Sequence, residues 1–230
     1  MDLLRAISIY GLLNVLIFAF LFIAFKIIKR NKSTLSKYLF AFFVTQSAPW
    51  ILNLIYAPLT ITPIVTFLHL TAIFIGMVGM TNLTIALLIL WKSKHIITRK
   101  VQFTILISYT VFFSLFYIIP EGLIINESTG WKPLYNLHFS LFAFFNLLLL
   151  HLIPILYLSY KIYASFQTRE LKKQWKYFLS GILLYFCILI STSFLNLFLD
   201  MFFKILIFIF GLLSIPSGYL IYRGIGKVDL

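Results

Sequence analysis

The chain has few charges and a single cysteine, and each shortage excludes classes of protein. Charged residues make up 11% of its 230 residues, whereas hydrophobic residues make up 62% and the mean hydropathy is +1.02. About a quarter of the residues of a soluble domain are charged, so a soluble globular fold and a disordered segment are both excluded. A single cysteine, Cys187, excludes an internal disulfide and a cysteine-based metal site.

Acidic residues are scarce as well, with six Asp and Glu against 19 Lys and Arg, which gives a net charge of +13. The basic residues form short clusters between apolar runs rather than one continuous face, so we expect no nucleic-acid partner. The middles of the apolar runs contain no charged residue, which counts against a proton-coupled transporter, a pump or a voltage sensor.

The residues needed for catalysis are missing too. The four histidines have no metal-ligand spacing and no accompanying carboxylate, and the sequence contains no Gly-rich phosphate loop and no evident Ser/His/Asp set. The sequence therefore predicts that the protein is not an enzyme and that it holds no metal and no cofactor.

The chain contains several long apolar runs. A helix needs about 20 apolar residues to cross the hydrocarbon core of a bilayer, and seven runs qualify. We predict an all-α, multi-pass protein of the cell membrane, with one seven-helix domain over residues 1–230. The predicted spans cover residues 7–28, 38–57, 65–91, 101–119, 138–160, 177–199 and 203–222.

The orientation follows from the distribution of Lys and Arg. Sixteen of the 19 basic residues fall at alternate connections and at the carboxyl-terminal tail, whereas Arg5, Lys132 and Lys204 fall on the other side. Basic residues concentrate in cytoplasmic loops, so the pattern predicts an amino terminus outside and a carboxyl terminus in the cytoplasm. A turn at Asp200 separates the last two spans, since merging them would move Arg223 to the outer side.

Neutral polar side chains remain within the apolar runs, many of them in the outer half. If their faces converge, they line a cavity open to the outside, with aromatic walls and a few hydrogen-bonding groups, as is usual for a small-molecule site. The alternative is that they form hydrogen bonds between helices. The candidate ligand-binding residues are Asn14, Trp50, Asn53, His69, Tyr117, Asn146 and Asn196.

Three helices carry internal prolines, Pro49, Pro154 and Pro216. A proline removes a backbone donor and leaves the carbonyl four residues earlier without its partner. For Pro154 this carbonyl belongs to Leu150, and the adjacent His151 is expected to bridge to it.

The segment Lys161–Lys176 has no helix breaker, so the fifth and sixth helices are expected to extend into the cytoplasm there. Four of its basic residues are candidates for contact with anionic lipid headgroups or with an acidic partner. They are Arg169, Lys172, Lys173 and Lys176.

Several short motifs resemble the seven-helix amino-terminal sensor region of bacterial and archaeal histidine kinases. They are Gly130-Trp131 with Pro133-Leu134-Tyr135, Arg169 with Lys173-Gln174, the opening Tyr177–Gly181, and the ending Tyr219–Arg223 with Val228–Leu230. In that family the same amino-out bundle precedes cytoplasmic signalling domains. The resemblance implies a stand-alone input module that acts through a separate output protein, because the chain ends where the effector region begins.

Two functions fit these patterns. The first hypothesis is a membrane sensor or receptor-like module that binds a small or lipidic ligand in the outer cavity and signals through a separate cytoplasmic or membrane partner. The alternative is a structural or transport-related subunit of a larger membrane complex. In both, the lipid bilayer is the surrounding partner.

Overall fold

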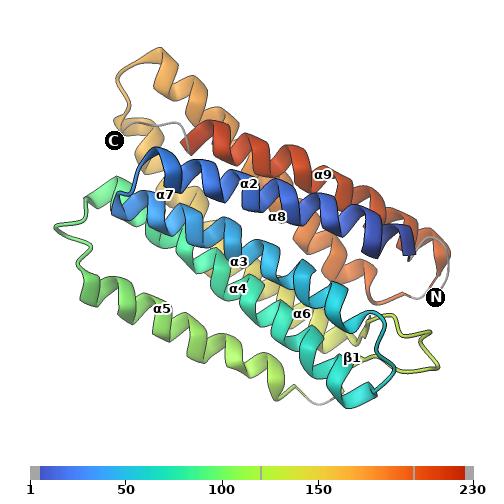
Figure 1. The fold of residues 1–230 in the computed structure, drawn as a ribbon. Helices are drawn as coiled ribbons and strands as arrows, with labels where there is room; N and C mark the ends of the chain where they lie inside the picture. The colour runs from blue at the N-terminus through green and yellow to red at the C-terminus, as the bar shows by residue number, and fades with distance from the viewer. Residues whose placement is uncertain (1–5, 120, 199, 226–230) are drawn as a thin grey trace.

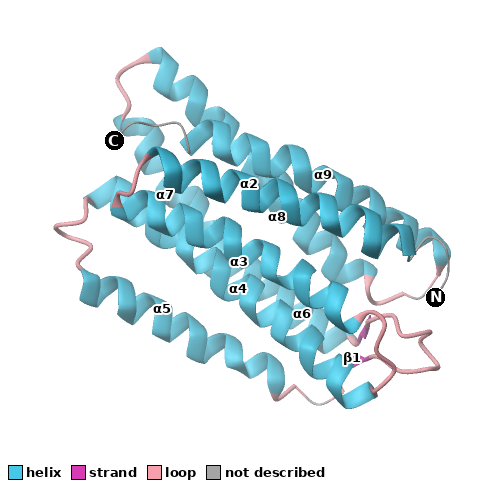
Figure 2. Cartoon of the chain, viewed as in Figure 1, coloured by secondary structure: helices cyan, strands magenta, loops and turns pink. Residues whose placement is uncertain are grey.

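A computed structural model describes residues 6–119, 121–198 and 200–225, and most of them are helical (Figure 2). Arg5, Lys227 and the segment Val228–Leu230, on which parts of the orientation and of the resemblance depend, lie outside these residues. In chain order the elements are the π-helix η1 (Ile7–Leu12), α2 (Leu13–Arg30), α3 (Thr34–Tyr56), α4 (Thr62–Lys92), α5 (Arg99–Phe113), the 3-10 helix η2 (Ser114–Tyr117), β1 (Leu123–Ile124), β2 (Leu134–Tyr135), α6 (Leu137–Phe145), the π-helix η3 (Asn146–Leu152), α7 (Ile153–Ser165), α8 (Arg169–Leu195) and α9 (Met201–Ile225).

Within the described residues, seven helical segments are long and apolar enough to cross a membrane. They are η1–α2, α3, α4, α5–η2, α6–η3–α7, α8 and α9, where adjoining elements form one continuous segment. The prediction of an all-α fold with seven such helices is confirmed, and these helices fit a multi-pass membrane protein.

The expected extension of the helices around residues 161–176 is also confirmed. α7 continues to Ser165 and α8 begins at Arg169, eight residues before the predicted start of the sixth span. Thr168 supplies the amino-terminal cap, because its side chain accepts a hydrogen bond from the backbone N–H of Leu171. α8 ends at Leu195, and the next helix begins just after Asp200.

The helices run along one another, and their connections alternate between the two ends of the bundle (Figure 1). The connections α2–α3, α4–α5 and α7–α8 lie at the end where α9 finishes, whereas η1 begins at the opposite end (Figure 1). We call the opposite end the hairpin end, because the β1–β2 pair lies there.

The bundle is built from closely packed neighbours. α8 packs along α9, α3 packs along α4, and α2 lies against α3, whereas α5 lies on the flank of α4 (Figure 1). Aromatic side chains fill much of the core, and Phe20, Phe42 and Phe178 are fully buried. Gly181 allows the close approach of α8 to α9, since a Cβ atom there would lie 2.7 Å from the backbone nitrogen of Ile221.

The connection between η2 and α6 folds into a small hairpin. β1 pairs antiparallel with β2, so that Leu123 faces Tyr135 and Ile124 faces Leu134. Asn136 then begins α6 by accepting a hydrogen bond from Phe139 N–H at 2.8 Å. The hairpin thereby places Tyr135 against the end of the bundle, where the residue is buried.

The backbone carbonyl that Pro154 leaves without a helical donor has a different partner from the one expected. The carbonyl oxygen of Leu150 accepts a hydrogen bond from Tyr109 Oη at 3.0 Å, so the predicted bridge by His151 is wrong. His151 is fully buried beside the rings of Tyr109 and Phe113, and neither of its nitrogens has a partner among the described residues. The lost donor also coincides with a π-helical turn, η3, immediately before the proline. Tyr109 on α5 therefore ties this helix to the irregular turn.

Candidate ligand-binding cavity

A cavity of about 400 Å³ lies inside the bundle and extends from the hairpin end toward the middle. Its walls come from η1–α2, α3, α4, α8 and α9, and residues of the β1–β2 connection lie over its end. Small-molecule sites have volumes of roughly 300–1,000 Å³, so the size suits a small ligand.

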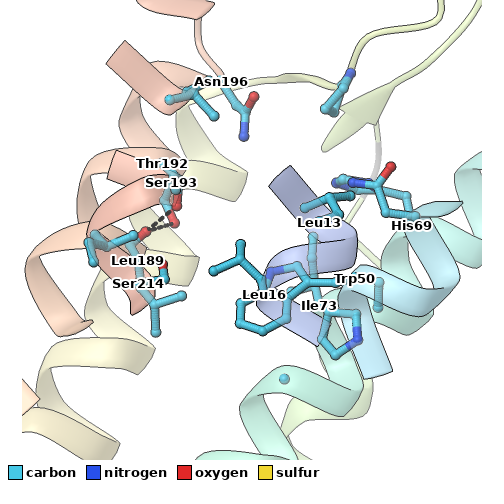
Figure 3. Close-up of a pocket in the computed structure, with 18 of the residues that line it drawn as sticks. Leu13, Leu16, Trp50, His69, Ile73, Leu189, Thr192, Ser193, Asn196 and Ser214 are labelled. Atoms are coloured by element: carbon cyan, nitrogen blue, oxygen red, sulfur yellow. Dashed lines mark hydrogen bonds between the residues drawn. The ribbon is translucent and has the colours of Figure 1, made fainter. Parts of the chain in front are cut away.

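The two long walls of the cavity face each other across open space (Figure 3). Thr192 and Ser193 on α8 lie on one side together with Asn196, which caps that helix, whereas Trp50 on α3 and His69 on α4 lie on the other (Figure 3). Both hydroxyls on α8 donate to the carbonyl oxygen of Leu189 at 2.9 Å, so the sequence places polar groups there without breaking the helix.

A hydrogen-bond network joins three parts of the chain at the hairpin end. Tyr56 Oη lies 2.6 Å from Nδ1 of His69, and Nε2 of the same ring lies 2.9 Å from Tyr135 Oη. A neutral imidazole has one donor and one acceptor, so one hydroxyl donates to the ring and the other accepts from it. The backbone N–H of Tyr135 also donates to the carbonyl oxygen of Asn196 at 2.9 Å, which ties β2 to the residue that caps the end of α8. The network fixes α3, α4, β2 and α8 relative to one another.

Tyr135 lies in the hairpin, and its hydroxyl remains protonated. Burial raises the pKa of the Tyr135 phenol above its usual range. The neutral hydroxyl therefore keeps its proton for the network at physiological pH.

A second polar bridge lies deeper in the cavity. Gln46 Nε2 donates to the carbonyl oxygen of Gly76 at 2.8 Å, and Gln46 Oε1 accepts from Tyr185 Oη at 2.7 Å. Gln46, Gly76 and Tyr185 all line the cavity, so this bridge connects α3, α4 and α8. Between the network at the hairpin end and the bridge of Gln46, the cavity walls are apolar and include Leu16, Ile73 and Ile188.

The structure brings four of the seven candidate ligand-binding residues to this cavity. Trp50, Asn53, His69 and Asn196 all line it. The side chain of Asn53 has no hydrogen bond with any described residue, so its amide remains available to a ligand. Trp50 is half-buried and packs edge-on against Phe20, which fixes its ring at the wall.

The other three candidates do not line the cavity. Asn14 Nδ2 donates to the carbonyl oxygen of Tyr10 at 2.7 Å, and Asn146 Nδ2 donates to that of Phe142 at 2.6 Å. Each of these two amides thus bonds to its own helix. Tyr117 Oη donates to Thr71 Oγ1 at 3.0 Å, on a flank of α4 away from His69.

Several lining residues were not among the candidates. Tyr56, Tyr135, Tyr185 and Gln46 supply the two polar bridges, and Lys132 and Lys204 add two positive charges. In the sequence, the one sign of these lysines was that they fall on the predicted outer side of the membrane, where basic residues are few.

The basic candidates at the other end lie on the first two turns of α8. Arg169, Lys173 and Lys176 are exposed, and Lys172 is half-buried with its ammonium 5.8 Å from the centre of the Tyr163 ring. This placement leaves the exposed side chains free to contact headgroups or another protein.

Among the described residues, the cavity lining includes no Asp and no Glu, and no three His, Cys, Asp or Glu side chains come together to hold a metal ion. Comparison with protein-family models, with curated proteins and with solved structures finds no match.

Proposed function

We propose that the protein is a membrane-embedded, receptor-like module that binds a small amphipathic ligand in the cavity. One observation carries the proposal: an apolar cavity of about 400 Å³ has one polar network at its hairpin end and a second bridge in its depth. Such a lining matches the usual small-molecule site, in which a few fixed polar groups orient a mostly apolar ligand.

The same contacts provide a route from binding to signalling. Tyr135 bonds to His69 on α4 through its hydroxyl and to the carbonyl oxygen of Asn196, at the end of α8, through its backbone N–H, so a ligand that displaces Tyr135 shifts α8 relative to α4. α8 continues beyond the bundle to Arg169, where exposed basic side chains are available to a partner. A ligand shifts the equilibrium between two positions of α8 relative to α4 only if it binds these two arrangements with different affinity.

The proposal places the hairpin end outside and the end of α9 in the cytoplasm. The α2–α3, α4–α5 and α7–α8 connections at the α9 end are rich in Lys and Arg, which supports this orientation. To test it, Cys187 is replaced by serine and one cysteine is introduced at Ser128 or at Lys94. In intact cells a membrane-impermeant maleimide is expected to label Ser128→Cys only, and labelling of Lys94→Cys instead would reverse the orientation.

The native cysteine provides the functional test. Cys187 is exposed on α8, and the next residue, Ile188, lines the cavity. An environment-sensitive dye on Cys187 is expected to respond saturably to a single-chain amphipath such as oleate or oleyl alcohol. A dye signal that only rises in proportion to the amphipath concentration would contradict the proposal, because partition into the surrounding detergent or lipid has no saturation.

A matched pair of variants separates the cavity from the lipid-facing surface. Thr192→Phe places an aromatic ring in the cavity, whereas Leu183→Phe places the same ring on an exposed face of α8. We expect Thr192→Phe to lose the saturable response and Leu183→Phe to keep it. If both variants respond like the unchanged protein, the ligand does not occupy this cavity.

One observation favours the alternative of a complex subunit. α5 is the least buried of the seven candidate spans in the described residues, and its Phe103, Ile107 and Val111 are all about 60% exposed at helical spacing. In a complex, a partner helix would cover this stripe in place of lipid. Native mass spectrometry from a mild detergent distinguishes the two functions, because a monomer favours the receptor-like module and a stable hetero-oligomer favours the subunit.

A further inference from the structure

We propose that the outward face of α8 binds an anionic phospholipid from the leaflet at the α9 end of the bundle. The negative headgroup lies at the basic turns that begin α8, and one acyl chain lies along the apolar turns that follow. This site is separate from the cavity, so it goes beyond the proposed function and does not require a ligand there.

Six exposed positions of α8 form one continuous face. They are Arg169, Lys173, Lys176, Ser180, Leu183 and Cys187. Their spacing alternates between four and three residues, which keeps side chains on one side of a helix with 3.6 residues per turn. Trp175, Phe178 and Ile182 are fully buried on the opposite side. The six exposed side chains therefore point away from the bundle.

The outward face changes from basic to apolar along its length. Arg169, Lys173 and Lys176 occupy its first two turns, whereas Leu183 and Cys187 are exposed farther along. A phospholipid is divided in the same way, into a polar headgroup and apolar chains. An acidic protein partner would account for the basic turns but not for the apolar turns on the same side, so an anionic phospholipid fits the whole face.

A hydrogen bond between α7 and α8 indicates the depth of these residues in a bilayer. Trp175 Nε1 donates to the carbonyl oxygen of Ser159 at 2.9 Å, so the two residues lie at the same level. The next residue of α7, Tyr160, is 65% exposed, and tyrosines of membrane proteins are enriched at the interface between hydrocarbon and water. The interface is therefore expected to cross α8 near Trp175.

This depth places the basic turns among the headgroups and the apolar turns beside the acyl chains. A helix rises 1.5 Å per residue, so Arg169 lies about 9 Å from Trp175 in the direction of the solvent, whereas Leu183 and Cys187 lie about 12 Å and 18 Å from it in the other direction. The headgroups form a layer of about 5–8 Å on each side of the hydrocarbon core, which the long Arg169 side chain reaches from just above.

Arg223 on α9 adds positive charge beside this face. Its guanidinium lies 4.2 Å from the centre of the ring of Tyr177, the residue that follows Lys176 on α8. The one acidic residue within residues 161–176, Glu170, lies about 100° around the helix from Arg169. Basic side chains thus outnumber acidic ones at the start of α8, and an anionic headgroup is attracted to it.

The test measures which lipid lies beside Cys187, the only cysteine of the chain, through a fluorescent dye on its thiol. The protein is reconstituted in mixtures of phosphatidylcholine and phosphatidylglycerol, one of which carries bromine in its acyl chains and quenches a nearby dye. One basic residue near an anionic headgroup favours it about fivefold, so the unchanged protein is expected to prefer phosphatidylglycerol at least about fivefold. Lys173→Gln combined with Lys176→Gln is expected to lower this preference to about twofold or less.

Lys94→Gln combined with Lys100→Gln serves as the matched control. Both lysines are exposed, and they lie in the α4–α5 connection and the first turn of α5, at the same end of the bundle but away from α8 (Figure 1). This pair removes the same charge and is expected to keep the preference. Quenching by brominated phosphatidylcholine alone is expected to be equal in all three proteins, which shows that the variants fold and insert.

Three results would overturn the proposal. If the unchanged protein shows no preference for phosphatidylglycerol, the basic turns of α8 are left to an acidic protein partner. If the Lys173 and Lys176 double variant keeps the preference, these side chains do not hold the headgroup. If both double variants lose the preference equally, the attraction comes from the charge of the whole end and not from a site on α8. None of these results bears on the cavity, which the saturable response to oleate tests separately.

Discussion

Replacing Gly181 with alanine tests the close packing of α8 on α9. A Cβ atom at this position would lie 2.7 Å from the backbone nitrogen of Ile221 and 2.8 Å from the carbonyl oxygen of Ser217. Both contacts are with backbone atoms, so neither can be relieved by a rotamer change. Forcing extra atoms into a packed core typically costs about 1–3 kcal/mol.

Gly76→Ala provides the matched control, since this glycine also lies within a long helix. Its added Cβ would meet only the Cγ atom of Pro49 at 3.5 Å, an ordinary contact distance. Both variants gain the same helix propensity, about 1 kcal/mol for alanine over glycine, so their difference isolates the steric cost. We expect Gly181→Ala to have the lower free energy of unfolding by about 1–3 kcal/mol, measured by titration with a denaturing detergent in mixed micelles. Equal stabilities would refute the close approach of the two helices.

Two further pairs of variants test the polar groups. Tyr185→Phe removes the donor to Gln46 and is expected to cost between about 0.6 and 1.7 kcal/mol of unfolding free energy, the average and the maximum for hydrogen bonds between membrane helices. Tyr117→Phe is expected to cost less, because Tyr117 lies at a less buried site. If the same titration gives equal losses, the deep bridge is not a stabilising contact. Asn53→Ala is expected to keep the stability and weaken oleate binding, whereas His69→Ala is expected to lower both, because only His69 holds two hydrogen bonds of the fold. A stable His69→Ala protein would contradict the structural role of the network.

The number and type of the helices could be predicted from the sequence because length and polarity determine them. A run of about 20 apolar residues has few alternatives to a membrane-spanning helix. The extension of α8 to Arg169 was equally predictable, since residues 161–176 contain no proline or glycine. These features depend on local composition and not on how the helices are rotated.

The rotation of each helix about its axis could not be predicted, and it decides which polar residues meet. His69 and Thr71 are two positions apart on α4, a rotation of about 200° at 3.6 residues per turn. His69 therefore faces the cavity, whereas Thr71 accepts a hydrogen bond from Tyr117 on another flank. Both His69 and Tyr117 were expected in the outer halves of their predicted spans, so their depth in the membrane did not distinguish them.

The sequence pattern also could not predict that residues of the hairpin line the cavity. Tyr135 and Lys132 reach the cavity only because the β1–β2 connection folds back over the end of the bundle. The partner of the Leu150 carbonyl was missed for a similar reason. Tyr109 is 41 positions away in the chain, and its contact with η3 depends on where α5 packs.

Tryptophan fluorescence offers the most direct test of the cavity as a ligand site. Trp50 lines the cavity, whereas Trp175 is fully buried and does not line it. Two proteins, each keeping one of these tryptophans and carrying phenylalanine at the other three tryptophan positions, are titrated in nanodiscs with a dibrominated stearate, whose bromine atoms quench nearby indoles. We predict that Trp50 fluorescence falls saturably, that excess oleate restores it, and that Trp175 fluorescence stays constant. Equal quenching of both tryptophans, or quenching of Trp50 without saturation, would show that the probe dissolves in the bilayer instead of entering the cavity.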